Sequence, residues 1–106
     1  MTPHADARPA GPTTHEAQQR LEHARNTRLA QLRALDGTGQ SADDHLLSVQ
    51  AEAIRRVLTE IDEAFARVAD GSYGRCVGCA KPVAAERLEI LPYTRYCITC
   101  QRHAAG

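Results

Sequence analysis

A chain of 106 residues with one Phe, one Met and no Trp has the length of a single domain but few large apolar side chains for a thick globular core. Its formal net charge of zero gives it no overall attraction to nucleic acid. No apolar run reaches the roughly 20 residues of a membrane-spanning helix, and the N-terminus lacks the apolar segment of a signal peptide. These features predict a thin, helical, cytoplasmic protein with no membrane span.

The N-terminal segment, residues 1–12, contains three prolines and shows no apolar periodicity. This composition predicts a disordered tail. Thr13 and Glu16 then form a capping-box pattern, in which each side chain accepts a hydrogen bond from the other residue's backbone N–H. A first helix is therefore expected from about Thr14 to Leu35. Leucines lie on or near one face of this helix, namely Leu21, Leu29, Leu32 and Leu35.

Residues 36–42 are expected to form the tip of a helical hairpin. Two glycines follow Asp36 within residues 37–40, and glycine commonly ends a helix and permits a chain reversal. Ser41 and Asp44 repeat the capping-box pattern, and Asp43 adds a negative charge that favours the first turn of a second helix. A turn this short makes the two helices antiparallel neighbours.

The second predicted helix carries an apolar seam and ends before Gly71. Its apolar residues alternate steps of three and four, which is the heptad pattern of a coiled coil; they are Leu47, Ala51, Ile54, Leu58, Ile61, Phe65 and Val68. The first helix is slightly basic and the second acidic, so ion pairs between them favour the pairing. Residues 13–70 are thus predicted to form an antiparallel two-helix coiled-coil hairpin in a mostly α protein.

All four cysteines lie after the hairpin, in two C-x-x-C pairs. Cys76 and Cys79 are separated from Cys97 and Cys100 by 17 residues, a spacing typical of a four-cysteine zinc site. Two residues between cysteines let one backbone turn direct both thiolates at one ion. Since four thiolates fill a tetrahedral shell, the predicted cofactor is one structural Zn²⁺. Two disulfides, or a thioredoxin-like redox pair, are the alternatives for the same cysteines.

The segment around these cysteines resembles the zinc finger of the DksA/TraR family. The resemblance lies in Gly71-Ser-Tyr-Gly-Arg-Cys-Val-Gly-Cys79, Pro82, Glu86-Arg-Leu-Glu89, Pro92 and Tyr96-Cys-Ile-Thr-Cys-Gln101. It covers about the last forty residues closely and the helical stretch in general plan, so residues 71–106 are expected to form a zinc finger module. Ala80 departs from the family, which generally has glycine there, and Gly78 in the same turn is expected to absorb some of the bend.

The resemblance implies a regulator that binds bacterial RNA polymerase and inserts its hairpin into the secondary channel. Some family members act together with the alarmone ppGpp, so ppGpp is a candidate ligand. The sequence ends six residues after Cys100, so the C-terminal helix of longer members is expected to be absent, which weakens the case for ppGpp. Family members typically present aspartates at the tip. The candidates here are Asp36, Asp43 and Asp44, while Arg33 occupies the position of one family acid.

Three other functions are weighed against this one. No phosphate-cradling glycine loop or nucleophile with a base is present, so an enzyme is not expected. Residues 71–106 carry a surplus of basic residues, namely Arg75, Lys81, Arg87, Arg95 and Arg102 against Glu86 and Glu89. This surplus keeps open a zinc finger that binds DNA, although direct DNA binding is not expected because no long basic recognition helix is predicted. A structural coiled-coil adaptor is the remaining alternative.

Overall fold

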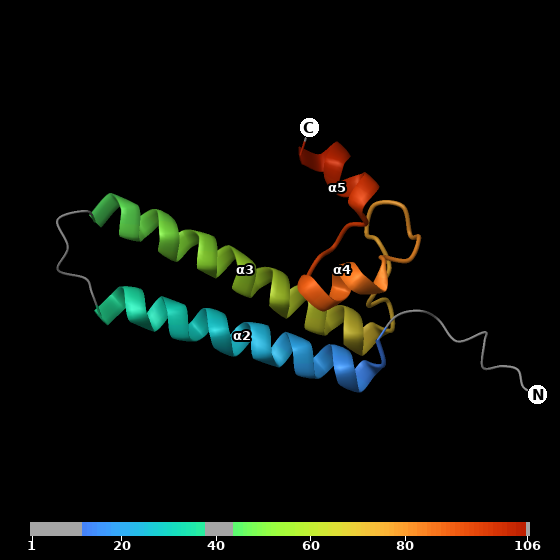
Figure 1. Ribbon diagram of the computed structural model, residues 1–106, viewed down its shortest axis with the longest axis horizontal. Coiled ribbons are helices and arrows are strands. Elements are labelled where there is room, and N and C mark those ends of the chain that lie inside the picture. Colours follow the sequence, from blue (N-terminus) through green and yellow to red (C-terminus); the bar gives the residue numbers. More distant parts are fainter. Residues whose placement is uncertain (1–11, 38–43, 106) are drawn as a thin grey trace, which may run out of the picture.

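Two long helices lying side by side give the molecule its elongated shape (Figure 1), with principal extents of 64, 31 and 21 Å. The computed structural model describes residues 12–37 and 44–105. In this part of the chain, α2 (Thr14–Gly37) and α3 (Asp44–Asp70) run antiparallel, and the short helices α4 (Ala85–Ile90) and α5 (Ile98–Ala105) follow. The predicted fold, a mostly helical chain with a hairpin followed by a four-cysteine module, is confirmed.

Local sequence signals set the start of α2 and the end of α3. The Thr13 N–H donates to Oε1 of Glu16 over 2.9 Å, and the Glu16 N–H donates to Oγ1 of Thr13 over 3.1 Å, so the predicted capping box is present. At the other end, Oδ1 of Asp70 accepts hydrogen bonds from the N–H and the hydroxyl of Ser72. These bonds lower the pKa of the Asp70 carboxyl. Gly71 has φ +85°, the left-handed conformation in which a glycine often ends a helix.

The helices differ slightly from the predicted ranges at the tip. Helix α2 continues through Gly37, so Asp36 lies within its last turn rather than after it. Helix α3 begins at Asp44. The tip between them, residues 38–43, lies outside the described residues, and with it the predicted cap residue Ser41.

The core of the hairpin is small and lies near its base. Leu21 of α2 and Ile61 and Ala64 of α3 are fully buried there. Partly buried side chains from both the helices and the cysteine module pack against them, namely Ala24, Val57, Phe65, Val68, Tyr73 and Tyr93. Toward the tip burial declines, and Val49 is 49 % exposed. The stability of the hairpin therefore depends on its base. No described helix is long and apolar enough to cross a bilayer.

The buried face of α3 is wider than the predicted heptad seam. Ala51 and Ile61 of the seam are buried, and its other members are half-buried. Ala64 is buried and Val57 packs on the core, although neither belongs to the seam. A straight helix repeats every 3.6 residues and packs here against two neighbours, α2 and the cysteine module, so a strict heptad stripe underestimates its buried face.

One predicted ion pair joins the two long helices. A guanidinium nitrogen of Arg25 lies 3.7 Å from Oδ1 of Asp62. Both side chains are at least half exposed, so the pair contributes at most about 1 kcal/mol. It helps to select the partner helix, while burial of the apolar base stabilises the pairing.

Candidate metal centre

The four cysteines lie at the meeting point of a tight turn and the start of α5. Cys76 and Cys79 belong to the turn, and Cys100 lies in the first turn of α5, three residues after Cys97. All four Sγ atoms lie within 4.8 Å of one another, and those of Cys79 and Cys97 are 3.9 Å apart. Tetrahedral zinc with Zn–S bonds of about 2.3 Å places its sulfurs ~3.8 Å apart. The geometry therefore fits one zinc ion held by four thiolates.

Short backbone hydrogen bonds shape the first turn. The Ala80 N–H donates to the carbonyl oxygen of Cys76 over 2.8 Å, and the Cys76 N–H donates to the carbonyl oxygen of Lys81, also over 2.8 Å. Closing this turn requires a left-handed residue, and Ala80 adopts φ +67°. The expectation that Gly78 absorbs the bend is therefore wrong, because the bend falls on the residue with a Cβ.

Gly78 has a different role, which is to permit a close approach between the two cysteine pairs. A Cβ atom at this position would lie 3.2 Å from the sulfur of Cys100 and 3.6 Å from the ring of Tyr96. The Gly78 N–H also donates to Sγ of Cys76 over 3.3 Å. A side chain here would push the second cysteine pair away from the first, so the glycine keeps the four sulfurs together.

The surroundings of the sulfurs favour a thiolate at Cys76. Burial raises the pKa of this thiol, but hydrogen bonds, first from the backbone of Cys97 and Cys79, outweigh burial and lower the pKa to about 6. Hydrogen bonds with Cys76 and Cys97 raise the pKa of Cys100 to about 12, since its thiol is then the donor to a neighbouring sulfur. A metal ion that replaces the shared protons satisfies all the sulfurs together.

The structure excludes the two alternatives for these cysteines, namely two disulfides and a thioredoxin-like redox pair. All four cysteines are free thiols, so the structure contains no disulfide. In the described part of the chain the only β-structure is an isolated bridge between Arg75 and Pro82, and no βαβ unit of a thioredoxin-like redox protein surrounds the pairs. Since thiolates fill all four positions of a tetrahedral shell, the site has no open position for substrate. The zinc is structural.

A second apolar cluster covers the cysteines and is joined to the hairpin core by one tyrosine. Cys76, Val83 and Leu88 are buried together, and Tyr73 packs against both this cluster and the core around Leu21 and Ile61. Burial raises the pKa of the Tyr73 hydroxyl. The sequence offered no signal for this bridging position, because its neighbours come from three separate segments.

Arginines fix the loop between α4 and α5 to the rest of the structure. Arg67 of α3, whose pKa is lowered chiefly by burial, donates to the carbonyl oxygens of Tyr93 and Thr94 over 3.5 and 3.4 Å. Arg87 of α4 donates to the carbonyl oxygen of Tyr96 over 3.1 Å. These bonds provide donors for loop carbonyl groups that form no hydrogen bonds within a strand or a helix.

Several of the basic residues in the cysteine module already bind other groups of the same protein. Arg75 donates to the carbonyl oxygen of Ala80 over 3.2 Å, Arg87 binds the loop, and Arg95 lies 4.0 Å from Glu63 of α3 and over the ring of Tyr96. A sequence count of charges cannot distinguish an arginine that binds a carbonyl group from one that is free to bind a partner. The surplus available to nucleic acid is therefore smaller than the count implies.

Of the predicted tip residues, Asp36 is the one whose side chain the structure describes, and it lies far from the metal centre. Asp36 is exposed in the last turn of α2, at the end of the hairpin opposite the cysteine module (Figure 1). Asp44 is the first residue of α3, and its side chain lies outside the described residues, as does all of Asp43. These candidates remain predictions.

Comparison with known proteins identifies the cysteine module. Residues 71–103 match the model of the prokaryotic dksA/traR C4-type zinc finger. The RNA polymerase-binding transcription factor DksA of Caulobacter vibrioides is 40 % identical over 50 residues, which are 46 % of this chain and 35 % of that protein. General stress protein 16O of Bacillus subtilis is 36 % identical over 50 residues, 47 % of this chain and 31 % of that protein. These matches span about a third of each relative's length.

The fold as a whole also has a solved counterpart. The structure of transcription factor DksA2 from Pseudomonas aeruginosa superposes with a TM-score of 0.53 and 27 % sequence identity, covering 87 % of this chain and 74 % of that one. The likeness therefore extends beyond the cysteine module to the hairpin, and the resemblance predicted from the motifs is confirmed. The chain carries a DksA/TraR C4-type zinc finger, here called the finger, on a DksA-like helical hairpin.

Proposed function

We propose that this protein is a zinc-binding transcription regulator that binds bacterial RNA polymerase and inserts its hairpin into the secondary channel. The observation that carries the proposal is the combination of a DksA/TraR finger with an antiparallel hairpin in one fold similar to DksA2. A relative that is 40 % identical over 50 residues is named an RNA polymerase-binding transcription factor. RNA polymerase as partner implies the cytoplasm as compartment.

The dimensions of the hairpin support insertion. Helix α2 has 24 residues and α3 has 27, which at about 1.5 Å per residue gives a probe of roughly 35 to 40 Å. The finger lies at the base of the hairpin, so the distal part consists of the two paired helices alone and is narrow (Figure 1). The distal part of α3 also exposes two apolar side chains outside the seam, Leu46 and Val49, each 49 % exposed, which could contact the wall of such a channel. This role is regulatory, and no enzymatic step is assigned to the protein.

A DNA-binding finger is the weaker alternative. Helix α4 has six residues and α5 has eight, whereas helices that read the major groove present several base-contacting side chains along a basic face. Of the finger's arginines, Arg75, Arg87 and Arg95 already bind within the protein. An adaptor that self-associates through its hairpin is the other alternative.

The decisive experiment is capture of purified RNA polymerase core enzyme by the immobilised, zinc-loaded protein, without DNA. A photo-crosslinker placed at Arg33, near the tip, is expected to label subunits that line the secondary channel, while one at Lys81 on the finger labels the channel's outer rim. Capture with both crosslinks outside the channel would reject insertion but keep polymerase binding. Salt-dependent binding to duplex DNA without polymerase capture would favour the DNA-binding alternative. Adding ppGpp to the same assay tests whether the alarmone changes binding.

A further inference from the structure

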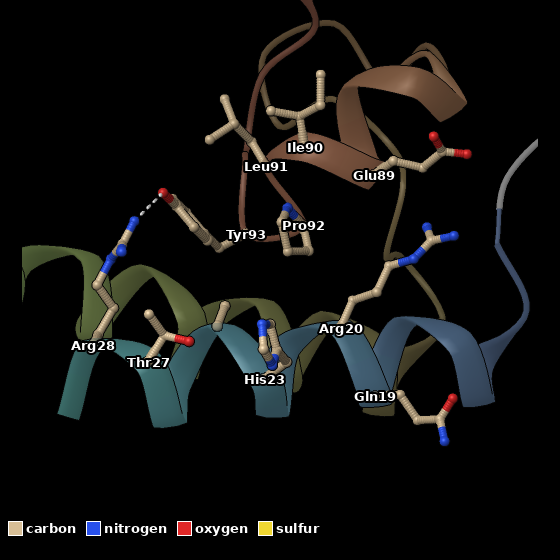
Figure 2. A pocket seen from close by; sticks show the side chains of 11 residues that line it. Gln19, Arg20, His23, Thr27, Arg28, Glu89, Ile90, Leu91, Pro92 and Tyr93 are labelled. Atoms are coloured by element: carbon tan, nitrogen blue, oxygen red, sulfur yellow. Dashed lines mark hydrogen bonds between the residues drawn. The ribbon is translucent and has the colours of Figure 1, made fainter. Parts of the chain in front are cut away.

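A groove lies between the first half of α2 and the finger (Figure 2). Its volume is about 430 Å³. Side chains from α2 form one wall, and the end of α4 with the following loop forms the other. The charged and polar ones include Arg20, His23 and Arg28 from α2 and Glu89 and Tyr93 from the finger.

Two arginines in this groove have no acidic partner in the described part of the chain. Among the residues described, neither Arg20 nor Arg28 forms an ion pair, whereas Arg25, on another face of α2, pairs with Asp62. The acid one turn before Arg20 is Glu16, and its Oε1 already accepts the Thr13 N–H.

The bonds that Arg28 does make are neutral and long. Its guanidinium donates to the hydroxyl of Tyr93 over 3.4 Å and to Oε1 of Gln31 over 3.5 Å. Neither bond neutralises the charge. Of the described residues that line the groove, Glu89 is the single acid, against two arginines, so the groove attracts anions.

The spacing of the arginines indicates the shape of the ligand. Arg20 and Arg28 are eight residues apart on one helix, which separates them by about 12 Å along its axis. One phosphate or carboxylate group cannot contact both at this distance. In an extended peptide, acidic residues four positions apart are separated by about 13 Å and point to the same side. The spacing therefore matches a chain with two acids rather than a single small anion.

The surface between the two arginines is partly apolar: α2 contributes Ala24 beside the polar His23 and Thr27. Pro92 is buried beneath the groove, and Leu91 is half-buried in its wall. Ile90, which is 77 % exposed, is directed away from α2 and lies outside the space between the two arginines (Figure 2). Ala24 on the opposite wall is small and leaves room for an entering side chain. An apolar residue between the two acids would bury this surface.

We infer that the groove between α2 and the finger binds an extended acidic peptide segment of a partner protein, with two acids four positions apart and an apolar residue between them. Arg20 and Arg28 bind the acids, and Ala24 and Pro92 contact the apolar residue. Glu89 lies on the finger side of the groove (Figure 2) and disfavours a third acid in the peptide. The surface is distinct from the hairpin tip, so its occupancy does not depend on insertion into polymerase.

The test uses the full-length, zinc-loaded protein and a fluorescent blocked peptide with two glutamates four positions apart and a central leucine. Fluorescence anisotropy at low ionic strength is expected to show saturable binding. Arg20→Gln and Arg28→Gln should each weaken binding about three- to fivefold, as expected for losing one exposed charge pair. Glu89→Gln should strengthen binding, because it removes a like charge. Arg33→Gln, an exposed arginine of α2 outside the groove, is the matched control and should have no effect.

Further measurements distinguish binding in the groove from partial unfolding and from nonspecific charge attraction. Zinc content and helical circular dichroism must match the unaltered protein in every variant, so that a weakened complex reflects the groove. A peptide with glutamines in place of glutamates should bind at least about threefold more weakly. Equal binding of the glutamate and glutamine peptides would overturn the inference. Binding of the glutamate peptide by the Arg20 and Arg28 variants as tightly as by the unaltered protein would overturn it too. If pyrophosphate displaces the fluorescent peptide at a lower concentration than unlabelled peptide does, the groove binds a small anion instead. That result would also overturn the inference.

Discussion

The hydroxyl of Tyr73 donates a 2.7 Å hydrogen bond to the carbonyl oxygen of Pro92, and the ring of Tyr73 packs on the cores of both the hairpin and the finger. Pro92 itself is buried. This contact joins the residue that follows α3 to the loop that follows α4. Tyr73 therefore helps to set the orientation of the finger on the hairpin, through an apolar ring and a polar end.

Tyr73→Phe tests the polar half of this contact. The change leaves the Pro92 carbonyl group without its partner, and we expect the free energy of unfolding to fall by about 0.5 to 1.5 kcal/mol. Chemical denaturation followed by circular dichroism measures it. Tyr96→Phe is the matched control, because the Tyr96 hydroxyl has no hydrogen-bond partner among the described residues. Equal losses in both variants would show that the bond to Pro92 contributes nothing specific.

Removal of zinc should loosen the hairpin as well as the finger. In Cys97→Ser the ion loses one of its thiolates, and since metal affinity is folding free energy in such modules, we expect a lower melting temperature for the helices together with loss of zinc. Acidification should release zinc in the same way, because protonated thiols do not bind it. Thr99→Ser, between the same two cysteines, is the control. A helical melting temperature unchanged by Cys97→Ser would mean that the finger does not stabilise the hairpin.

Ala80→Gly should stabilise the first cysteine turn. Ala80 adopts φ +67°, which costs an L-residue with a Cβ about 1 to 2 kcal/mol. Glycine removes this cost but gains entropy in the unfolded chain, so the expected net gain is below about 1 kcal/mol. Competition with a chromophoric chelator should show slower zinc loss. Gly78→Ala is the opposing variant, because its Cβ would lie 3.2 Å from the Cys100 sulfur, and it should speed zinc loss.

Ile61→Ala should be the most damaging change in α3. The side chain is 0 % exposed and packs with Leu21, so its truncation should cost about 2 to 5 kcal/mol of unfolding free energy. Glu52→Ala, exposed on the same helix, should change stability by less than about 0.5 kcal/mol. Urea denaturation of both variants makes the comparison. Similar losses would mean that the base of the hairpin is not its core.

Asp36→Asn tests whether an acid at the hairpin tip acts on RNA polymerase once the hairpin is in the secondary channel. Asp36 is exposed near the tip and remote from the core, so the change should leave folding and polymerase capture intact. A carboxylate in a narrow channel acts on Mg²⁺ or basic residues with little screening, and its loss should abolish any effect on transcription in vitro. Regulation equal to that of the unaltered protein would show that Asp36 has no regulatory role and would move attention to Asp43 and Asp44.

The sequence alone determined the features whose partners lie close along the chain. The capping bonds between Thr13 and Glu16 follow from a spacing of three residues, and each C-x-x-C pair follows from one backbone turn. The four cysteines predicted as zinc ligands do lie together in the structure, because the ion accepts few donor types and the spacing of these cysteines is typical of its sites. The hairpin was predicted because apolar periodicity and turn residues are local patterns.

Only the tertiary structure decided which residues join the hairpin to the finger. The contacts of Tyr73 with Pro92, and of Arg67 with the Tyr93 carbonyl group, link segments 19 and 26 residues apart. The groove between Arg20 and Pro92 likewise exists only where α2 meets the finger. No local pattern encodes such contacts, because they depend on the angle at which two separately formed units pack, and that angle follows from shape and burial across the whole interface.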